Sequence, residues 1–209
     1  AYKPLVDAAL ALASHKPEFC VLLQRPEYPV ASESGRDIDF AEAETTGAPH
    51  PCVPVAAIDP LYVLYTSGTT GKPKGIVRDN GGHAVALMNS MAMVYGVSAG
   101  DVFWAASDVG WVVGHSYICY GPLLAGCTTI VYEGKPVGTP DAGAFWRVCA
   151  DHGVKVLFTA PTAIRAIKRD DSAGHLLHQH DLSRLQALFL AGERCDPDTV
   201  TWSQALLKK

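Results

Sequence analysis

The sequence predicts an α/β fold, in which a mostly parallel sheet carries helices on both faces. The first observation is that short apolar runs alternate with helix-forming stretches from residue 61 onward. Such alternation is typical of right-handed strand–helix–strand units, whose strands pair in parallel. The second observation is the composition, because 209 residues that are 48% hydrophobic and 18% charged suit a folded domain with a large core.

The elements in the first part of the chain are irregular. A helix is expected over residues 4–15, where Pro4 opens the first turn and the apolar residues share one face. The apolar run 19–23 predicts a strand. Residues 24–60 are rich in proline, glycine, serine and acidic side chains, so we expect an irregular connection with a short helix near 39–44.

The rest of the chain has a pattern regular enough to place each element. Strands are expected, in chain order, over residues 61–65, 76–78, 102–106, 128–132, 154–158 and 187–190. Helices are expected over residues 82–95, 115–124, 139–152, 161–169 and from 196 toward 207. Gly96 and Gly153 supply helix stops, and Thr139-Pro140-Asp141 is typical of a capped helix start.

Charge and cysteine content narrow the classes of function. The formal net charge of −4 disfavours a general nucleic-acid binder, and no apolar run reaches the length of a membrane span. Neither nucleic acid nor a membrane is therefore an expected partner. The six cysteines are scattered without a CxxC pair, which is typical of reduced thiols and disfavours a zinc site. With no signal peptide in the sequence, we expect a cytoplasmic protein, or one of the mitochondrial matrix if the source is eukaryotic.

Residues 66–75 form the most informative stretch, which lies between two predicted strands. Four hydroxyl residues, three glycines, two lysines and one proline fill these ten positions. Glycine lets the backbone approach a ligand, successive N–H groups bind anions, and lysine supplies charge, which together suit a polyphosphate. The loop differs from the common GxxxxGK[ST] loop because Pro73 follows Lys72, which disfavours a P-loop NTPase or kinase. A flexible linker is the other interpretation. Residues 61–65, however, are an apolar run expected to form a buried strand, and linkers rarely follow such a strand.

The run YTSGTTGKPKG, residues 65–75, resembles the signature phosphate loop of the adenylate-forming enzymes, which include acyl-CoA synthetases, luciferases and peptide-synthetase adenylation domains. The motif is long and specific for the superfamily, but by itself it does not give the substrate. The resemblance implies that ATP is a substrate with Mg²⁺, that coenzyme A is a co-substrate, and that Lys74 is catalytic. It implies no metal ligand within this chain. The residues implied to bind the ATP phosphates are Thr66, Ser67, Gly68, Thr69, Thr70, Gly71 and Lys74.

The segment DVGWVVGHSY, residues 108–117, follows a predicted strand and is rich in large apolar side chains. By itself it fits either the wall of a pocket for a small acid or a packed corner between a strand and a helix. It resembles the DVGWVTGHSY segment of short-chain acyl-CoA synthetases. The resemblance implies an approach for coenzyme A beside Val113 and Gly114, with Val113 standing where the acetyl-CoA synthetases usually carry Thr. The residues implied to form the acyl pocket are Trp111, Val112 and Ala191.

Histidines are not expected to take part in the chemistry. His115 is expected to be structural or gating, because the attacking carboxylate of an acid is already ionised near neutral pH and needs no general base. His175, His178 and His180 fall in a polar loop without ligand-like partners, so no metal site is expected there.

Two further segments follow predicted strands. Residues 158–165, FTAPTAIR, are by themselves a strand and a helix with proline in its first turn. They resemble a segment of short-chain acyl-CoA synthetases that implies contacts with the coenzyme A approach from Thr159 and Ala160. Residues 190–194, LAGER, are by themselves an ordinary charged loop, but they resemble the Gly-Glu-Pro segment that meets adenine. The residues implied to meet the adenine are Gly192, Glu193 and Arg194.

The expected function combines these motifs. The resemblance covers nearly the whole chain, most firmly residues 59–202, and implies an internal piece of the large domain of a short-chain acyl-CoA synthetase. Residues 133–141 and Arg194 resemble the propionyl-CoA synthetase branch more than the acetyl branch. We expect the parent protein to activate propionate through acyl-AMP to acyl-CoA, releasing AMP and pyrophosphate, and the 209 residues alone to be inactive. Acetate–CoA ligation is the nearest alternative, and a nucleotide-binding fragment without catalysis is another.

The predicted topology gives a test of whether these motifs form one site. Ligands of parallel sheets gather beyond the carboxyl ends of the strands. The four segments that follow strands, residues 66–75, 107–116, 159–162 and 191–194, are therefore expected to converge on one site.

Overall fold

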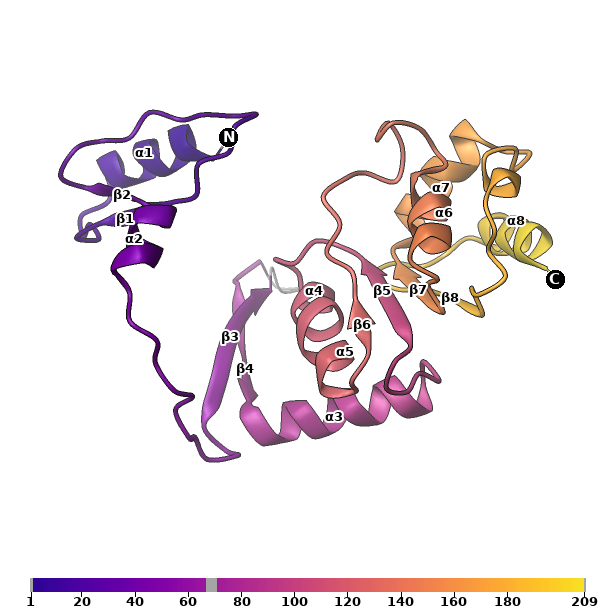
Figure 1. Cartoon of the computed structure of the whole chain (residues 1–209), viewed down its shortest axis with the longest axis horizontal. Helices are drawn as coiled ribbons and strands as arrows, with labels where there is room; N and C mark the ends of the chain where they lie inside the picture. Colours follow the sequence, from indigo (N-terminus) through magenta and orange to yellow (C-terminus); the bar gives the residue numbers. More distant parts are fainter. Residues whose placement is uncertain (1, 67–70, 209) are drawn as a thin grey trace. The chain divides into compact units, whose positions relative to one another are not determined.

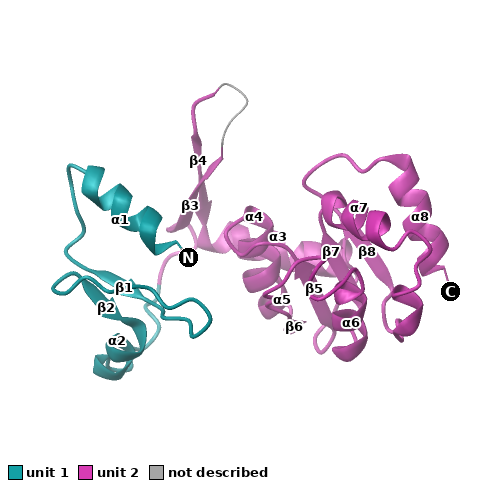
Figure 2. Ribbon diagram, turned by 90° about the horizontal axis from the view of Figure 1, so that it is seen from above, with its two compact units in different colours: residues 1–54 teal, residues 55–209 magenta. Residues whose placement is uncertain are grey.

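The structure is a computed structural model, and it describes residues 2–66 and 71–208. The described chain divides into two compact units, Ala1–Pro54 and Val55–Lys209 (Figure 2).

The first unit contains α1 (Lys3–Leu12), β1 (Cys20–Leu22), β2 (Asp37–Asp39) and α2 (Phe40–Thr46). Strands β1 and β2 pair in parallel. Helix α2 begins where expected because the Asp39 carboxylate accepts hydrogen bonds from the backbone N–H groups of Ala41 and Glu42. The expectation of an irregular connection over 24–60 missed β2, whose three residues, Asp-Ile-Asp, are too few to show an apolar pattern.

A group of charged side chains holds this unit together. Lys3 Nζ lies 2.6 Å from an Asp7 oxygen and 2.9 Å from an Asp37 oxygen. The Arg36 guanidinium lies 2.6 Å from Asp7 and 2.7 Å from Asp37. The Asp37 side chain has no exposed surface. The hydrogen bond from Arg36 is the main reason that the pKa of the Asp37 carboxyl lies below its ordinary value.

The second unit begins with a hairpin of β3 (Pro60–Thr66) and β4 (Lys74–Asp79), which pair antiparallel and lead into α3 (Asn80–Met93). The prediction that the phosphate loop links two strands is confirmed. The prediction that the first of these strands is buried is wrong, since Val63 is 50% exposed and Tyr65 is 71% exposed. Within the described residues β3 pairs with β4 alone and is not part of the larger sheet.

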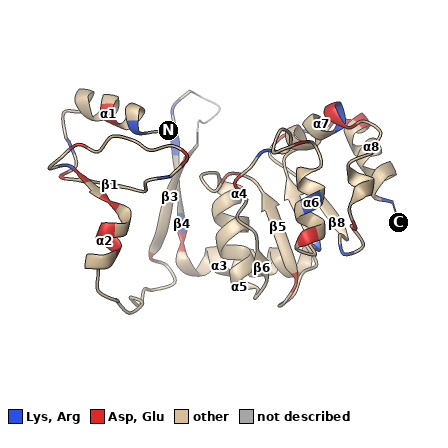
Figure 3. Ribbon diagram, turned by 45° about the horizontal axis from the view of Figure 1, so that its top comes forward, with Lys and Arg blue, Asp and Glu red and all other residues tan. Residues whose placement is uncertain are grey.

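The larger sheet positions the candidate site. Within the described residues it consists of β6 (Thr128–Thr129), β5 (Val102–Ala106), β7 (Val156–Thr159) and β8 (Ala187–Leu190), in that order and all parallel. Neither β5 nor β8 contains a charged residue, as Figure 3 shows. Near-continuous apolar strands of this kind are typical of parallel sheets that are covered on both faces.

Side chains that alternate along the strands divide the core into two clusters. Trp104 and Leu157 belong to one cluster, together with residues of α6 (Ala144–Asp151) and α7 (Pro161–Asp170). Phe103 and Phe158 belong to the other, together with residues of α3 and of the helix after β5. Figure 1 shows these helices beside the sheet. The predicted α/β class, with helices on both faces of a parallel sheet, is confirmed.

The remaining helices are close to their predicted places. The helix after β5 is continuous over α4 (Val112–Gly114), the π-helix η1 (His115–Tyr120) and α5 (Gly121–Leu124), so it begins three residues earlier than predicted. A short 3₁₀ helix, η2 (Leu177–Gln179), precedes β8. Helix α8 (Pro197–Leu207) begins as predicted because the Asp196 carboxylate accepts from the Thr199 N–H.

Two predicted boundaries are wrong around residues 128–144. Strand β6 ends at Thr129, because it pairs only with Val102 and Phe103 of β5. Helix α6 begins at Ala144 and not at 139, because Thr139 and Asp141 use their side chains in loop hydrogen bonds. Thr139 Oγ1 accepts from the Lys135 N–H and donates to the Lys135 carbonyl, and Asp141 accepts from the Gly143 N–H.

Candidate functional site

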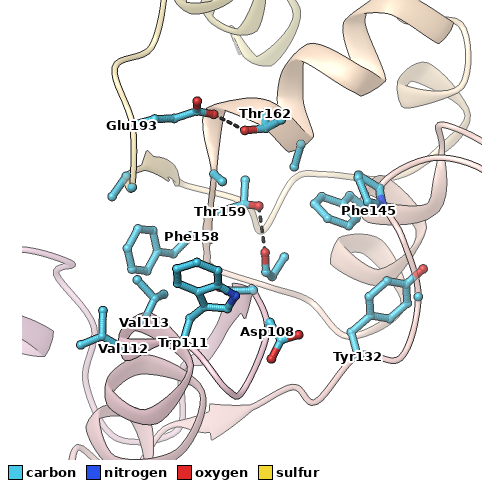
Figure 4. A pocket seen from close by; sticks show the side chains of 18 of the residues that line it. Asp108, Trp111, Val112, Val113, Tyr132, Phe145, Phe158, Thr159, Thr162 and Glu193 are labelled. Atoms are coloured by element: carbon cyan, nitrogen blue, oxygen red, sulfur yellow. Dashed lines mark hydrogen bonds between the residues drawn. The ribbon is translucent and has the colours of Figure 1, made fainter. Parts of the chain in front are cut away.

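A cavity of about 890 Å³ lies beyond the carboxyl ends of β5, β7 and β8 (Figure 4). The sheet register explains its position. Ala106, Thr159 and Leu190 are the last residues of their strands and stand in register across the sheet. The segments that leave these three strands therefore start side by side, and all three line the cavity. The loop after β6 contributes a further part of the wall.

One wall of the cavity is apolar. Trp111, Val112 and Ala191, the residues expected to form an acyl pocket, all line it. Trp111 is 67% exposed, although a large aromatic side chain normally packs into a core. Figure 4 shows Trp111 beside Val112 and Val113, with Phe158 on the same side. This wall can cover the hydrocarbon part of a small ligand and remove it from water.

Hydroxyl and carboxylate groups line another part of the cavity. Thr159, buried to 2% exposure, donates its hydroxyl hydrogen to the Ala106 carbonyl at 2.9 Å. Thr162 donates to Glu193 Oε1, and Figure 4 marks both bonds. The hydrogen bond from Thr162, followed by the charge of Arg165, keeps the pKa of the Glu193 carboxyl below its ordinary value. Glu193 is therefore an ionised acceptor at the cavity edge at neutral pH.

Of the residues expected to contact coenzyme A or adenine, some line the cavity and others do not. Val113, Thr159 and Ala160 line the cavity, and so do Gly192 and Glu193. Arg194 and Gly114 are not among the lining residues.

Gly114 is buried because the backbone of Asp108 and Val109 packs directly against it. A Cβ at this position would stand 2.2 Å from the Asp108 carbonyl oxygen and 2.5 Å from Val109 Cα. Only glycine lets the helix that follows β5 approach the preceding loop so closely.

The described residues of the predicted phosphate loop do not line the cavity. Thr66, Gly71 and Lys74 belong to the end of the β3–β4 hairpin, and none of them lines the cavity. Thr66 pairs with Lys74 across the hairpin, and Gly71 has a φ of +81°, a backbone conformation that favours glycine. Ser67, Gly68, Thr69 and Thr70 lie outside the described residues. Three of the four predicted segments therefore meet at one place.

The fourth part of the cavity wall was not predicted from the sequence. Tyr132, Glu133 and Phe145 line the cavity, and Trp104 packs beneath Tyr132 and Phe145 at ring distances of 5.4 and 5.0 Å. Tyr132 and Glu133 close a strand-like run in the sequence. The rule that ligands gather after parallel strands would have found them.

Histidines lie away from the cavity lining. The His115 ring packs against Tyr62 at 5.2 Å, and its Nδ1 is buried without a hydrogen-bond partner among the described residues. In the described ranges, no three His, Cys, Asp or Glu residues are grouped so that they could hold a metal ion. None of the helices in these ranges combines the length and hydropathy that a bilayer crossing requires.

The fold is that of an α/β domain with a cavity where its parallel strands end. Comparison with known proteins identifies its family: the chain belongs to the AMP-binding enzyme family, whose model matches residues 4–209.

Relatives extend this assignment. The chain is 56% identical, over 99% of its length, to human acyl-CoA synthetase short-chain family member 3, mitochondrial, of which it covers 30%. It is 50% identical, over 96% of its length, to propionate–CoA ligase of Salmonella typhimurium, of which it covers 32%. Its fold matches acetoacetyl-CoA synthetase from Streptomyces lividans with a TM-score of 0.70 and 29% identity, over 85% of this chain and 26% of that one. The predicted resemblance to short-chain acyl-CoA synthetases is confirmed, and the chain spans about a third of these relatives or less.

Proposed function

We propose that the intact protein activates a short-chain carboxylic acid, propionate, with ATP and transfers it to coenzyme A. The observation that carries the proposal is the meeting of Trp111, Val112 and Ala191 in one cavity with the polar edge at Thr162 and Glu193. An apolar wall beside polar groups suits a small acid that must be held next to a nucleotide. The names of the relatives, short-chain acyl-CoA synthetase and propionate–CoA ligase, support the same class of reaction.

In the first step, a carboxylate oxygen of the acid forms a bond to the α-phosphorus of ATP, and the bond to the pyrophosphate oxygen breaks. The developing negative charge would be neutralised by the N–H and hydroxyl groups of residues 66–71 and by Lys74. The acid needs no general base because it is already ionised. Gly71 fits this role, since its backbone has a positive φ and an added Cβ would meet nothing within 4 Å. Mg²⁺ would accompany ATP, and we assign no described residue to it.

In the second step, the thiol sulfur of coenzyme A forms a bond to the acyl carbonyl carbon, the bond from that carbon to the phosphate oxygen of AMP breaks, and the thiol proton passes to solvent. Val113, Thr159 and Ala160 would border the approach, and Gly114 would support it through backbone packing. The adenine would lie against Gly192 and Glu193, with Arg194 outside the cavity lining. The cavity of about 890 Å³ is larger than a propionate needs, which suits a site shared by an acid and parts of two larger substrates.

The choice of propionate rests on the apolar wall and on the relatives. One methylene in such a pocket changes selectivity by about 1–3 kcal/mol, so propionate should be preferred over acetate and butyrate. Acetate–CoA ligation is the second candidate, because it uses the same chemistry with a smaller acid. We place the protein in the cytoplasm or the mitochondrial matrix, in keeping with the mitochondrial relative.

The test is an assay of the intact protein with ATP, Mg²⁺, coenzyme A and each of the three acids. The expected result is AMP as product and the highest kcat/KM for propionate. A higher kcat/KM for acetate would remove the propionate assignment but leave the reaction class. ADP as product would remove the class itself.

Two variants sharpen the test. Lys74→Ala should slow acyl-AMP formation at least tenfold, which corresponds to about 1.4 kcal/mol of barrier. Lys16→Ala, which changes an exposed lysine of the first unit, is the matched control and should leave the rate unchanged. Equal rates for the two variants would remove Lys74 from the mechanism.

A further inference from the structure

Arg165 connects two carboxylates on the segment that follows β8. Its Nη2 donates to Glu193 Oε1 at 2.7 Å, and its Nη1 donates to Asp196 Oδ2 at 3.4 Å. Thr162, one helical turn before Arg165 on α7, donates to the same Glu193 oxygen. One face of α7 therefore holds the segment 193–196 at both of its acidic ends.

The two carboxylates have different tasks. Glu193 lines the cavity edge, whereas Asp196 caps α8 by accepting from the Thr199 N–H at 2.9 Å. Arg165 itself is not among the residues that line the cavity. Its guanidinium therefore fixes the cavity edge relative to the start of α8 without touching the contents of the cavity.

The segment needs such support because of Gly192. This glycine has a φ of +100°, and an added Cβ would meet nothing within 4 Å. The backbone just before Glu193 is thus conformationally free and has no side-chain packing of its own. Hydrogen bonds from α7 limit the conformations available to this edge before a ligand arrives.

We propose that Arg165 is a positioning residue for the nucleotide, because it preorganises the 192–193 edge against which the adenine is to lie. The inference rests on the proposed function, and it assigns to Arg165 a role in ATP affinity and none in acid selectivity. If the edge is mobile, binding of ATP must order it, and the cost appears as weaker binding of ATP alone. Of the three acyl-pocket residues, Trp111 and Val112 lie at the start of α4 and not on α7. The third, Ala191, precedes Gly192 and is held to β7 by its own N–H, which donates to the Thr159 carbonyl at 3.1 Å.

Arg165 contributes little to the stability of the fold. Its side chain is 36% exposed, and those of Glu193 and Asp196 are 41% and 44% exposed. Ion pairs with this degree of exposure contribute little to the free energy of folding. A substitution at Arg165 should therefore leave the protein folded, so that an effect on ATP can be measured separately.

The experiment compares three variants of the intact protein. Arg165→Gln should raise the KM for ATP about three- to tenfold, the order expected for leaving one charged side chain and its loop unordered. The KM for the acid, kcat and the melting temperature should stay close to the wild-type values. Arg165→Lys should give an intermediate KM, because an ammonium group does not reach two carboxylates with a fork of donors. Arg169→Gln is the matched control on the same helix, since Arg169 is 73% exposed and pairs with the neighbouring Asp170.

Two results would overturn the inference. One is an equal KM for ATP in Arg165→Gln and Arg169→Gln. The other is a loss spread evenly over the KM for ATP, the KM for the acid and the melting temperature, which is the behaviour of a structural residue.

The inference can fail separately from the proposed function. If the wild-type protein activates no short-chain acid, the proposed function fails. Calorimetric titration of the same proteins with ATP then decides the role of Arg165. A weaker Kd in Arg165→Gln than in Arg169→Gln supports that role, and equal Kd values overturn it.

Discussion

Replacement of Gly114 by alanine should destabilise the protein by about 2 kcal/mol, because the added methyl group has no space. The new Cβ would lie 2.2 Å from the Asp108 carbonyl oxygen, 2.5 Å from Val109 Cα and 2.7 Å from the Val109 carbonyl carbon. All three neighbours are backbone atoms, so no side chain can rotate away. The backbone of the cavity wall or the helix must move by about an ångström to restore ordinary contact.

Opposing effects set the magnitude. Alanine is preferred over glycine inside a helix by about 1 kcal/mol, which would favour the variant. Overpacking of a close contact costs about 1–3 kcal/mol, and more where only backbone can yield. The steric term should exceed the propensity term because the contact distance of 2.2 Å is far below any ordinary approach of a Cβ to an oxygen.

Chemical denaturation of the intact protein measures the effect, with Gly110→Ala as the control. A Cβ at Gly110 would meet only the Asp108 carboxylate, at 3.0 Å, and that side chain can move. Each variant adds one methyl group, and both positions lie in the segment that follows β5. If their free energies of unfolding agree within about 0.5 kcal/mol, the packing argument for Gly114 is refuted.

Three further predictions test other parts of the structure. Tyr62→Phe should leave the free energy of unfolding unchanged or raise it by about 1 kcal/mol, since the Tyr62 hydroxyl is buried without a partner among the described residues. A decrease of about 1 kcal/mol in the free energy of unfolding, measured by chemical denaturation, would contradict this. Asp37→Asn should remove the part of the first unit's stability that depends on the ionised Asp37 carboxylate and is lost at acidic pH. The hydrogen bond from Arg36 lowers the pKa of Asp37 in the folded state, so the stability that it gives is present above about pH 4 and lost as the pH falls further; melting curves with the same pH dependence in both proteins would refute it. Trp111→Ala should raise the KM for the acid about tenfold or more and leave the KM for ATP unchanged, and steady-state kinetics with equal changes in both would remove Trp111 from the acid site.

The sequence predicted the sheet best where strands are short, apolar and bounded by polar residues. The bounds of β5 and β8 agree with the predicted ranges 102–106 and 187–190 to the residue. The prediction for 128–132 was too long, because an apolar run shows β propensity whether or not a partner strand extends beside it. The start of α6 was misplaced because Thr139 and Asp141 use their side chains in loop hydrogen bonds that compete with a helix cap.

The candidate site was predictable as far as topology determines it. Segments after β5, β7 and β8 meet because parallel strands end at one edge, and this follows from the order of elements alone. The ion pair between Arg165 and Glu193 joins residues that are 28 positions apart, so no local spacing reveals it. The packing role of Gly114 was likewise hidden, because a glycine in a motif gives no indication of whether a ligand or the chain's own backbone comes close.

Thr159 shows how the sheet edge can serve the site without using its polar group on a ligand. Its hydroxyl donates to the Ala106 carbonyl at 2.9 Å, in addition to the backbone pairing of β5 with β7. The residue is 2% exposed, so breaking this bond would leave a buried carbonyl with one acceptor site less satisfied. A ligand in the cavity therefore meets the remaining surface of Thr159 and not a free hydroxyl donor. The wall at Trp111 and the edge at Glu193 leave the sheet on either side of this fixed point, which is why a change at one should not alter the other.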